Sequence, residues 1–165
     1  MTSTHSMTRN FTLLLGAAVV SAGCAASHAA PPDAPGNADI VRDGLARGVG
    51  GADTFYALLA EDVRWTVARA TPRTYTSRQE FLDVAAAPIV DRLTGPIQAE
   101  VHEILADDDR VMARWRGTAT ARDGHPYVNE YNWVMTLEGG QVTDVVAYLD
   151  LVVLDELIER VPLPS

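Results

Sequence analysis

Hydrophobic and polar residues alternate along the second half of the chain, and this pattern predicts β-strands. Four alternating segments, rich in β-branched and aromatic residues, follow one another at 97–106, 110–120, 126–137 and 141–150. The short stretches between them are rich in aspartate and glycine, which is typical of turns. The pattern therefore predicts a four-stranded antiparallel meander.

The first half of the folded region shows the spacing of helices. Residues 39–47 form one predicted helix, and the glycine-rich residues 48–51 end it, because each glycine costs a helix about 1 kcal/mol. A second helix is predicted to begin after Asp53, which can cap it. Its apolar stripe consists of Phe55, Leu58 and Leu59.

The spacing of apolar residues then changes to that of a strand and afterwards returns to that of a helix. Alternation over 63–67 predicts a strand, and 71–76 has the composition of a loop. Ser77 and Glu80 have the spacing of a capping box and open a third helix, which Pro88 either kinks or restarts.

A C-terminal amphipathic helix is predicted over 153–160, and Asp150 can cap it. Helices in the first part of the chain and strands in the second predict an α+β fold, in which the helices cover one face of a curved antiparallel sheet.

The predicted strand 126–137 carries an aromatic face. Its odd-numbered side chains share one side by the two-residue period of strands: Tyr127, Asn129, Tyr131, Trp133, Met135 and Leu137. The carboxamide of Asn129 needs hydrogen-bond partners if it is buried, and a ligand, a water molecule or a nearby backbone carbonyl would serve. This face is a candidate pocket wall.

An export signal is predicted at the N-terminus. Arg9 precedes the apolar run 11–20, which is too short to span a bilayer, whether translation starts at Met1 or Met7. Cleavage after residue 29 and a lipobox ending at Cys24 both fit. We therefore predict a signal peptide (1–29), a proline-rich linker (30–37) and one folded domain (38–165), exported to the periplasm or anchored as a lipoprotein of a bacterium.

Composition excludes several classes of function. A net charge of −9, a pI near 4.7 and the absence of lysine leave no basic stripe for nucleic acid. One cysteine, Cys24, cannot form a disulfide within the chain, and the histidines have no metal-ligand spacing. No metal and no cofactor are predicted, and the only predicted membrane contact is the lipid anchor.

Four short segments carry a family resemblance: LAEDV at 59–63, RWRGT at 114–118, GHPY at 124–127 and AYLD at 147–150. With the order of the elements, they resemble the SnoaL-like branch of the nuclear transport factor 2-like superfamily. The resemblance implies a cone-shaped α+β barrel whose open end holds a small, mostly apolar molecule. Its members include ketosteroid isomerase, limonene epoxide hydrolase, polyketide cyclases and proteins that only bind or dimerise.

The catalytic sets of two relatives are incomplete in this chain. An overlay on limonene epoxide hydrolase matches its arginine to Arg114 but places Arg116 and Ala147 where it has aspartates. The second aspartate of ketosteroid isomerase falls near Asn132 or Trp133. Enzyme status therefore stays open.

The resemblance places Arg114 and Arg116 in the pocket, whereas alternation with apolar neighbours places them in solvent. A homodimer through the sheet would reconcile the two, because it buries both faces. The predicted pocket residues are Trp65, Arg114, Arg116, Asn129, Tyr131, Trp133, Ala147 and Leu149. Arg114 and Asp150 are weak catalytic candidates, and a helix cap is the simpler role for Asp150.

These observations support three hypotheses for the function of the protein. The first is binding of a small apolar or amphipathic molecule. The second is an isomerase or cyclase reaction on an enolisable carbonyl, with Asn129, Tyr131 and Arg114 stabilising the enolate. The third is an envelope accessory dimer that binds a protein partner.

Overall fold

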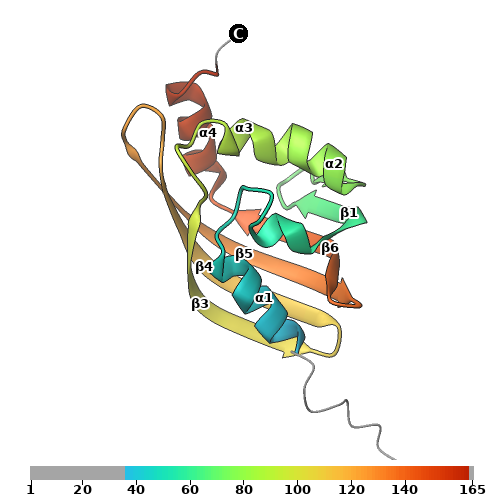
Figure 1. The fold of residues 1–165 in the computed structure, drawn as a ribbon. Helices are drawn as coiled ribbons and strands as arrows, with labels where there is room; N and C mark the ends of the chain where they lie inside the picture. Colours follow the sequence, from blue (N-terminus) through green and yellow to red (C-terminus); the bar gives the residue numbers. More distant parts are fainter. Residues whose placement is uncertain (1–35, 164–165) are drawn as a thin grey trace, which may run out of the picture. The chain divides into compact units, whose positions relative to one another are not determined.

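A computed structural model describes residues 36–163 (Figure 1). The predicted signal peptide, the lipobox at Cys24 and almost all of the predicted linker lie outside these residues. Between residues 36 and 163, no helix is both long enough and apolar enough to cross a membrane.

Helices precede the meander, and one helix follows it. The elements are α1 (Asn37–Ala46), the 3₁₀-helix η1 (Phe55–Leu58), β1 (Leu59–Val67), β2 (Arg73–Tyr75), α2 (Arg78–Phe81), the π-helix η2 (Leu82–Ala86), α3 (Ala87–Val90), β3 (Gln98–Asp107), β4 (Arg110–Thr120), β5 (Pro126–Glu138), β6 (Gln141–Leu149) and α4 (Leu151–Arg160). The segment α2–η2–α3 is one continuous helix whose middle turns have π geometry.

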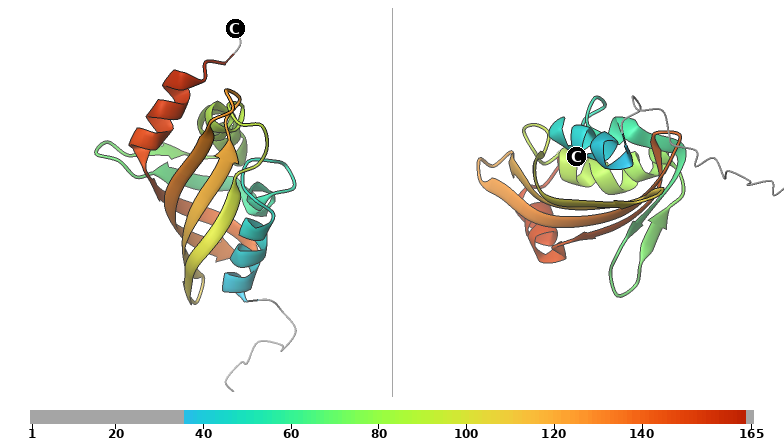
Figure 2. Two further views of the ribbon diagram at one scale, coloured as in Figure 1. Left: turned by 90° about the vertical axis from the view of Figure 1, so that its left-hand side faces the viewer. Right: turned by 90° about the horizontal axis from the view of Figure 1, so that it is seen from below.

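Within the described residues, six strands form a single curved, unclosed sheet in the order β2-β1-β6-β5-β4-β3 (Figure 2). The predicted meander, β3 to β6, is confirmed, and so is the α+β fold. One pairing differs from the antiparallel expectation, because β1 runs parallel to β6. The alternating pattern of β1 shows which side chains are buried but does not specify a partner strand.

The helices lie on the concave face of the sheet. Figure 2 shows α1 and the α2–η2–α3 helix on the same side of the curved strands. Helix α4 packs against α3 and β5 at one end of the sheet. The core between helices and sheet includes Phe55, Trp115 and Tyr127, all fully buried.

The predicted second helix was wrong beyond its first turn. Only η1 is helical, and β1 already begins at Leu59, which pairs with Val142. The predicted cap at Asp53 is also wrong, because the N-cap residue of η1 is Thr54 and its side chain does not cap the helix. The Thr54 hydroxyl instead accepts hydrogen bonds from the preceding amides of Gly50 and Gly51, at 3.2 and 3.0 Å. Pairing with a distant strand outweighs the local helical spacing.

The predicted loop 71–76 contains the short edge strand β2, which pairs with β1 and places the hydroxyls of Thr66 and Thr74 2.9 Å apart. The predicted cap at Ser77 is confirmed, because its hydroxyl accepts from the Glu80 amide at 3.1 Å. The Glu80 carboxylate reaches one residue further back than a standard capping box and accepts from the amide of Thr76 at 2.8 Å.

Candidate ligand pocket

A cavity of about 280 Å³ lies between the concave face of the sheet, the α2–η2–α3 helix and α4. This volume is just below the usual range for small-molecule pockets, about 300–1,000 Å³. Aromatic side chains form much of its wall: Tyr56, Trp65, Tyr75, Phe81, Trp115, Tyr131 and Trp133.

The strand register brings these side chains onto one face. Residues directly opposite each other on paired strands project from the same side of a sheet. Trp65 lies opposite Tyr75, Trp133 opposite Ala147, and Tyr131 opposite Leu149. The wall therefore follows from the pairing of four strands.

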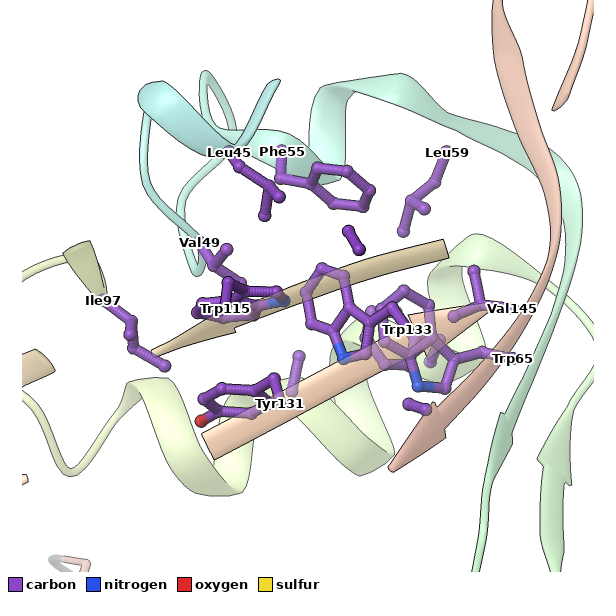
Figure 3. Packing of buried hydrophobic residues seen from close by; sticks show 14 of the residues in the cluster. Leu45, Val49, Phe55, Leu59, Trp65, Ile97, Trp115, Tyr131, Trp133 and Val145 are labelled. Carbon is purple, nitrogen blue, oxygen red and sulfur yellow. The ribbon is translucent and has the colours of Figure 1, made fainter. Parts of the chain in front are cut away.

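The rings contact one another closely (Figure 3). Trp65 stacks on Phe81 with centroids 4.0 Å apart, and Trp115 stacks on Tyr131 at 4.1 Å. Trp133 stands edge to face with Trp65 at 5.0 Å and with Trp115 at 4.8 Å, and so links the two stacks. Each contact stabilises the arrangement by about 0.5–1.5 kcal/mol beyond simple burial, so the wall is rigid.

Gly117 makes the stack of Trp115 on Tyr131 possible. A Cβ atom at this position would lie 2.8 Å from Cε2 of Tyr131, 2.9 Å from Cζ3 of Trp115 and 2.7 Å from Cγ2 of Ile97. Any other residue here must displace one of these side chains, and Tyr131 and Trp115 both belong to the pocket wall.

A buried hydrogen-bonded network lies behind the wall. The Tyr127 and Tyr131 hydroxyls are 2.8 Å apart, and Asn129 Nδ2 donates to the Tyr127 oxygen at 3.1 Å. Tyr127 is fully buried, whereas Tyr131 also lines the cavity. Either hydroxyl can be the donor of the hydrogen bond between them, so Tyr131 connects this buried network to the cavity wall.

Three tyrosine hydroxyls near the cavity stay protonated at neutral pH. Burial raises the pKa of Tyr56, and the nearby Tyr127 raises it further. Burial raises the pKa of Tyr131 well above its usual range, with added contributions from Tyr127. Burial also raises the pKa of Tyr127, although its hydrogen bonds to Tyr131 and Asn129 oppose the shift. These groups are hydrogen-bond donors, not bases.

Asn129 does not line the cavity. Its Nδ2 also donates to the carbonyl of Asp150 at 3.0 Å, and its Oδ1 accepts from the amide of Asp150 at 3.0 Å. Backbone groups thus satisfy this carboxamide, which ties β5 to the start of α4. It is not available to stabilise an enolate.

Asp150 has the predicted role of a helix cap. Its carboxylate accepts from the amides of Val152 at 2.9 Å and Val153 at 3.4 Å. The carboxylate is engaged at the N-terminus of α4, where the helix dipole favours negative charge. The structure shows it as a cap, and the cavity wall does not include it.

Arg114 and Arg116 lie on the convex face, outside the cavity, so their placement in the pocket is corrected. Their side chains are 54% and 48% exposed, and they lie 3.7 Å from the carboxylates of Glu103 and Glu130. Glu130 also lies 3.7 Å from His102. Strand alternation decides the matter, because Trp115 between the two arginines is fully buried on the concave face.

Five predicted pocket residues meet in the cavity wall: Trp65, Tyr131, Trp133, Ala147 and Leu149. The sequence interpretation missed three charged residues that also line it: Arg69 and Arg73 beside the β1–β2 turn, and Asp155 on α4. Arg69 continues the alternation of Trp65 and Val67, so a longer predicted strand would have revealed it. Between residues 36 and 163, no cluster of three or more His, Cys, Asp or Glu side chains is arranged to hold a metal ion.

The curved α+β fold with an apolar pocket between sheet and helices defines a protein of the nuclear transport factor 2-like class. Residues 43–145 match the sequence profile of the SnoaL-like domain. The chain belongs to the SnoaL-like domain family.

Solved structures share the fold. Bal32a, from a soil-derived mobile gene cassette, is 25% identical, with a TM-score of 0.58 over 73% of this chain and 95% of Bal32a. A Jannaschia protein provisionally classed as a SnoaL-like polyketide cyclase is 15% identical, with a TM-score of 0.55 over 76% of this chain and 88% of its own. A Rhodopseudomonas palustris protein provisionally classed as an isomerase is 13% identical, with a TM-score of 0.58 over 76% and 98%. No curated protein matches the chain significantly.

Proposed function

We propose that this chain is an exported SnoaL-like protein that binds a small apolar or amphipathic molecule in its aromatic cavity. The cavity of about 280 Å³ between sheet and helices carries the proposal. Export and a lipid anchor at Cys24 rest on the apolar run 11–20 and the small residues before the cysteine.

The chemistry of the wall supports a ligand with a ring. Stacked aromatic side chains present flat apolar surfaces, and Tyr131 in the same wall carries a hydroxyl that stays protonated at neutral pH. A mostly apolar pocket with a few directed polar groups is the usual design of a small-molecule site.

Native mass spectrometry of the full chain, purified from its own envelope, tests this proposal. We expect a copurified small molecule, and the mass of the N-terminus reports on lipidation of Cys24. Ala85→Phe, which adds bulk to the cavity wall, should release the molecule. Ala106→Phe adds the same bulk at an exposed position of β3 and should retain it.

An empty protein that also fails to take up ring-bearing molecules would contradict ligand binding. That result would favour the alternative of an envelope dimer that binds a protein partner.

One observation favours an isomerase or cyclase reaction as a second candidate. The cavity wall holds both Tyr131, whose hydroxyl stays protonated at neutral pH, and one carboxylate, Asp155, which would serve as the base. Loss of an oxyanion donor lowers kcat by about 10²–10³-fold. Tyr131→Phe should therefore lower kcat on an enolisable ketone by that factor with an unchanged circular dichroism spectrum, and an unaffected rate would exclude this role.

A homodimer through the convex face of the sheet is also proposed. Leu105 and Tyr148 are large apolar side chains on strands β3 and β6 that are 56% and 51% exposed. Analytical ultracentrifugation should show a dimer, and Tyr148→Glu should convert it to a monomer because it buries a charge at the contact. A monomeric wild-type protein would contradict this proposal.

A further inference from the structure

Two arginines line the cavity beside the turn between β1 and β2. Arg69 and Arg73 are both exposed and form no ion pair with a described carboxylate. Elsewhere in residues 36–163, six arginines do pair with aspartate or glutamate: Arg42, Arg64, Arg78, Arg114, Arg116 and Arg160. Four other arginines of these residues also form no ion pair: Arg47, Arg92, Arg110 and Arg122. Arg69 and Arg73 differ from these four because they line the cavity.

The β1–β2 strand pair brings both arginines to the cavity. Arg73 lies opposite Val67, two residues along the strand from the pair of Trp65 and Tyr75, so it projects from the same, concave face. Arg69 lies just beyond the end of β1, where the chain bends after the amide of Ala68 has donated to the carbonyl of Ala147 at 2.9 Å. Its side chain lines the same cavity.

The ring of Tyr75 holds Arg73 in place. The guanidinium carbon of Arg73 lies 5.0 Å from the centre of this ring, which is within the range of a cation–π contact. Tyr75 is buried and belongs to the cavity wall. A stacked guanidinium keeps its N–H groups at its edge, where they can bind an anion in the plane of the group.

We propose that Arg69 and Arg73 select an organic anion, with its ring in the aromatic cavity and a carboxylate or a similar charged group at the two guanidinium groups. This inference rests on the proposed function and names the class of ligand. Arginine binds carboxylate through paired hydrogen bonds, which suits this role. The carboxylate of Asp155 lies in the same wall and repels an anion. The preference for an anionic ligand therefore requires the two positive charges to outweigh this one negative charge.

Isothermal titration calorimetry of the full chain with two probes of equal shape tests the selection. 2-Naphthoate carries a carboxylate, and 2-naphthamide carries a neutral group in its place. Ion pairs near a protein surface contribute up to about 1 kcal/mol each, so the wild-type protein should bind naphthoate roughly three to tenfold more tightly.

Three variants locate the effect. The double variant Arg69→Gln/Arg73→Gln should lose the preference for naphthoate and still bind naphthamide. Arg64→Gln removes the same charge from β1, but Arg64 is exposed and lies 3.8 Å from Asp144, so this variant should keep the preference. Asp155→Asn removes the opposing charge and should increase the preference.

The outcomes separate the two proposals. If neither probe binds the wild-type protein, the pocket itself is refuted. If both bind with equal affinity, ligand binding stands and anion selection is refuted. Equal losses for both probes in the double variant would show that the arginines only support the fold, and would also refute the selection.

Discussion

The two faces of β4 and β5 have opposite chemistry, although they alternate along the same strands. On the concave face, Trp115 stacks on Tyr131 and forms part of the cavity wall. On the convex face, the neighbouring residues Arg116 and Glu130 lie 3.7 Å apart in partial contact with solvent. Adjacent residues thus belong to a rigid aromatic wall on one face and to weak surface ion pairs on the other. Whether a residue has an odd or an even position in the strand therefore indicates its role better than its residue type does.

The strongest test of this comparison is Trp115→Ala. It removes a fully buried ring from between Tyr131 and Trp133, and such truncations lower the free energy of unfolding by about 3–5 kcal/mol. Arg114→Ala, the adjacent change on the convex face, should cost less than about 1 kcal/mol. Urea denaturation of both variants measures the difference, and similar costs would contradict the comparison.

Two asparagines of β5 offer a matched pair for the next test. Asn129→Ala leaves the amide and carbonyl of Asp150 without this side-chain partner and removes one of the two partners of the Tyr127 hydroxyl, which should cost about 3 kcal/mol. Asn132, on the convex side, has a buried Oδ1 with no hydrogen-bond partner among the described residues. Asn132→Ala should therefore change stability by less than about 1 kcal/mol. Faster hydrogen exchange at the Asp150 amide in Asn129→Ala alone would confirm the link to α4.

The buried tyrosines predict a loss of stability at high pH. Burial raises the pKa of Tyr127 and of Tyr131, so the folded state keeps both protons after the unfolded chain begins to lose them. Their contribution to the free energy of unfolding is complete below pH ~10, the usual pKa of tyrosine. Above this pH, the contribution declines by up to about 1.4 kcal/mol per pH unit for each tyrosine. Urea denaturation across this range should show a smaller decline for Tyr131→Phe, and an unchanged slope would count against burial of this hydroxyl.

The smallest effect is expected for Arg116→Ala. The pair with Glu130 is exposed to solvent, so its loss should lower the free energy of unfolding by about 0.5 kcal/mol or less. High salt should abolish even this difference, because it screens exposed charges. This expectation holds for a single chain, at protein concentrations too low for a dimer to form. At higher concentrations, a larger cost that salt does not change would support burial of this face in the dimer proposed above.

Local patterns of the sequence predict much of this fold. The alternation from Tyr127 to Leu137 identifies the concave face of β5 correctly, and every residue of that set is buried. The turn at Gly139 and Gly140 is also confirmed, since both have positive φ, at +57° and +80°. In each case the signal lies within a few residues of the feature that it specifies.

Features that depend on distant partners could not be predicted in the same way. The strand β2 has three residues, too few to show a period, and it exists through its pairing with β1. The role of Asn129 depends on a backbone segment that only the folded sheet brings near. Arg69 and Arg73 become pocket residues through that same short strand pair.

The parallel pairing of β1 and β6 bears on the order in which the chain folds. The hairpins of the meander join strands that are neighbours in sequence, so each closes a short loop at small entropic cost. Joining β1 to β6 must instead close a loop that contains everything from β2 to β5. We expect the β1–β2 hairpin, which carries Trp65 and Tyr75, to dock last. During synthesis, the nascent chain thus has no complete ligand site until both β6 and α4, which also lines the cavity, have emerged from the ribosome.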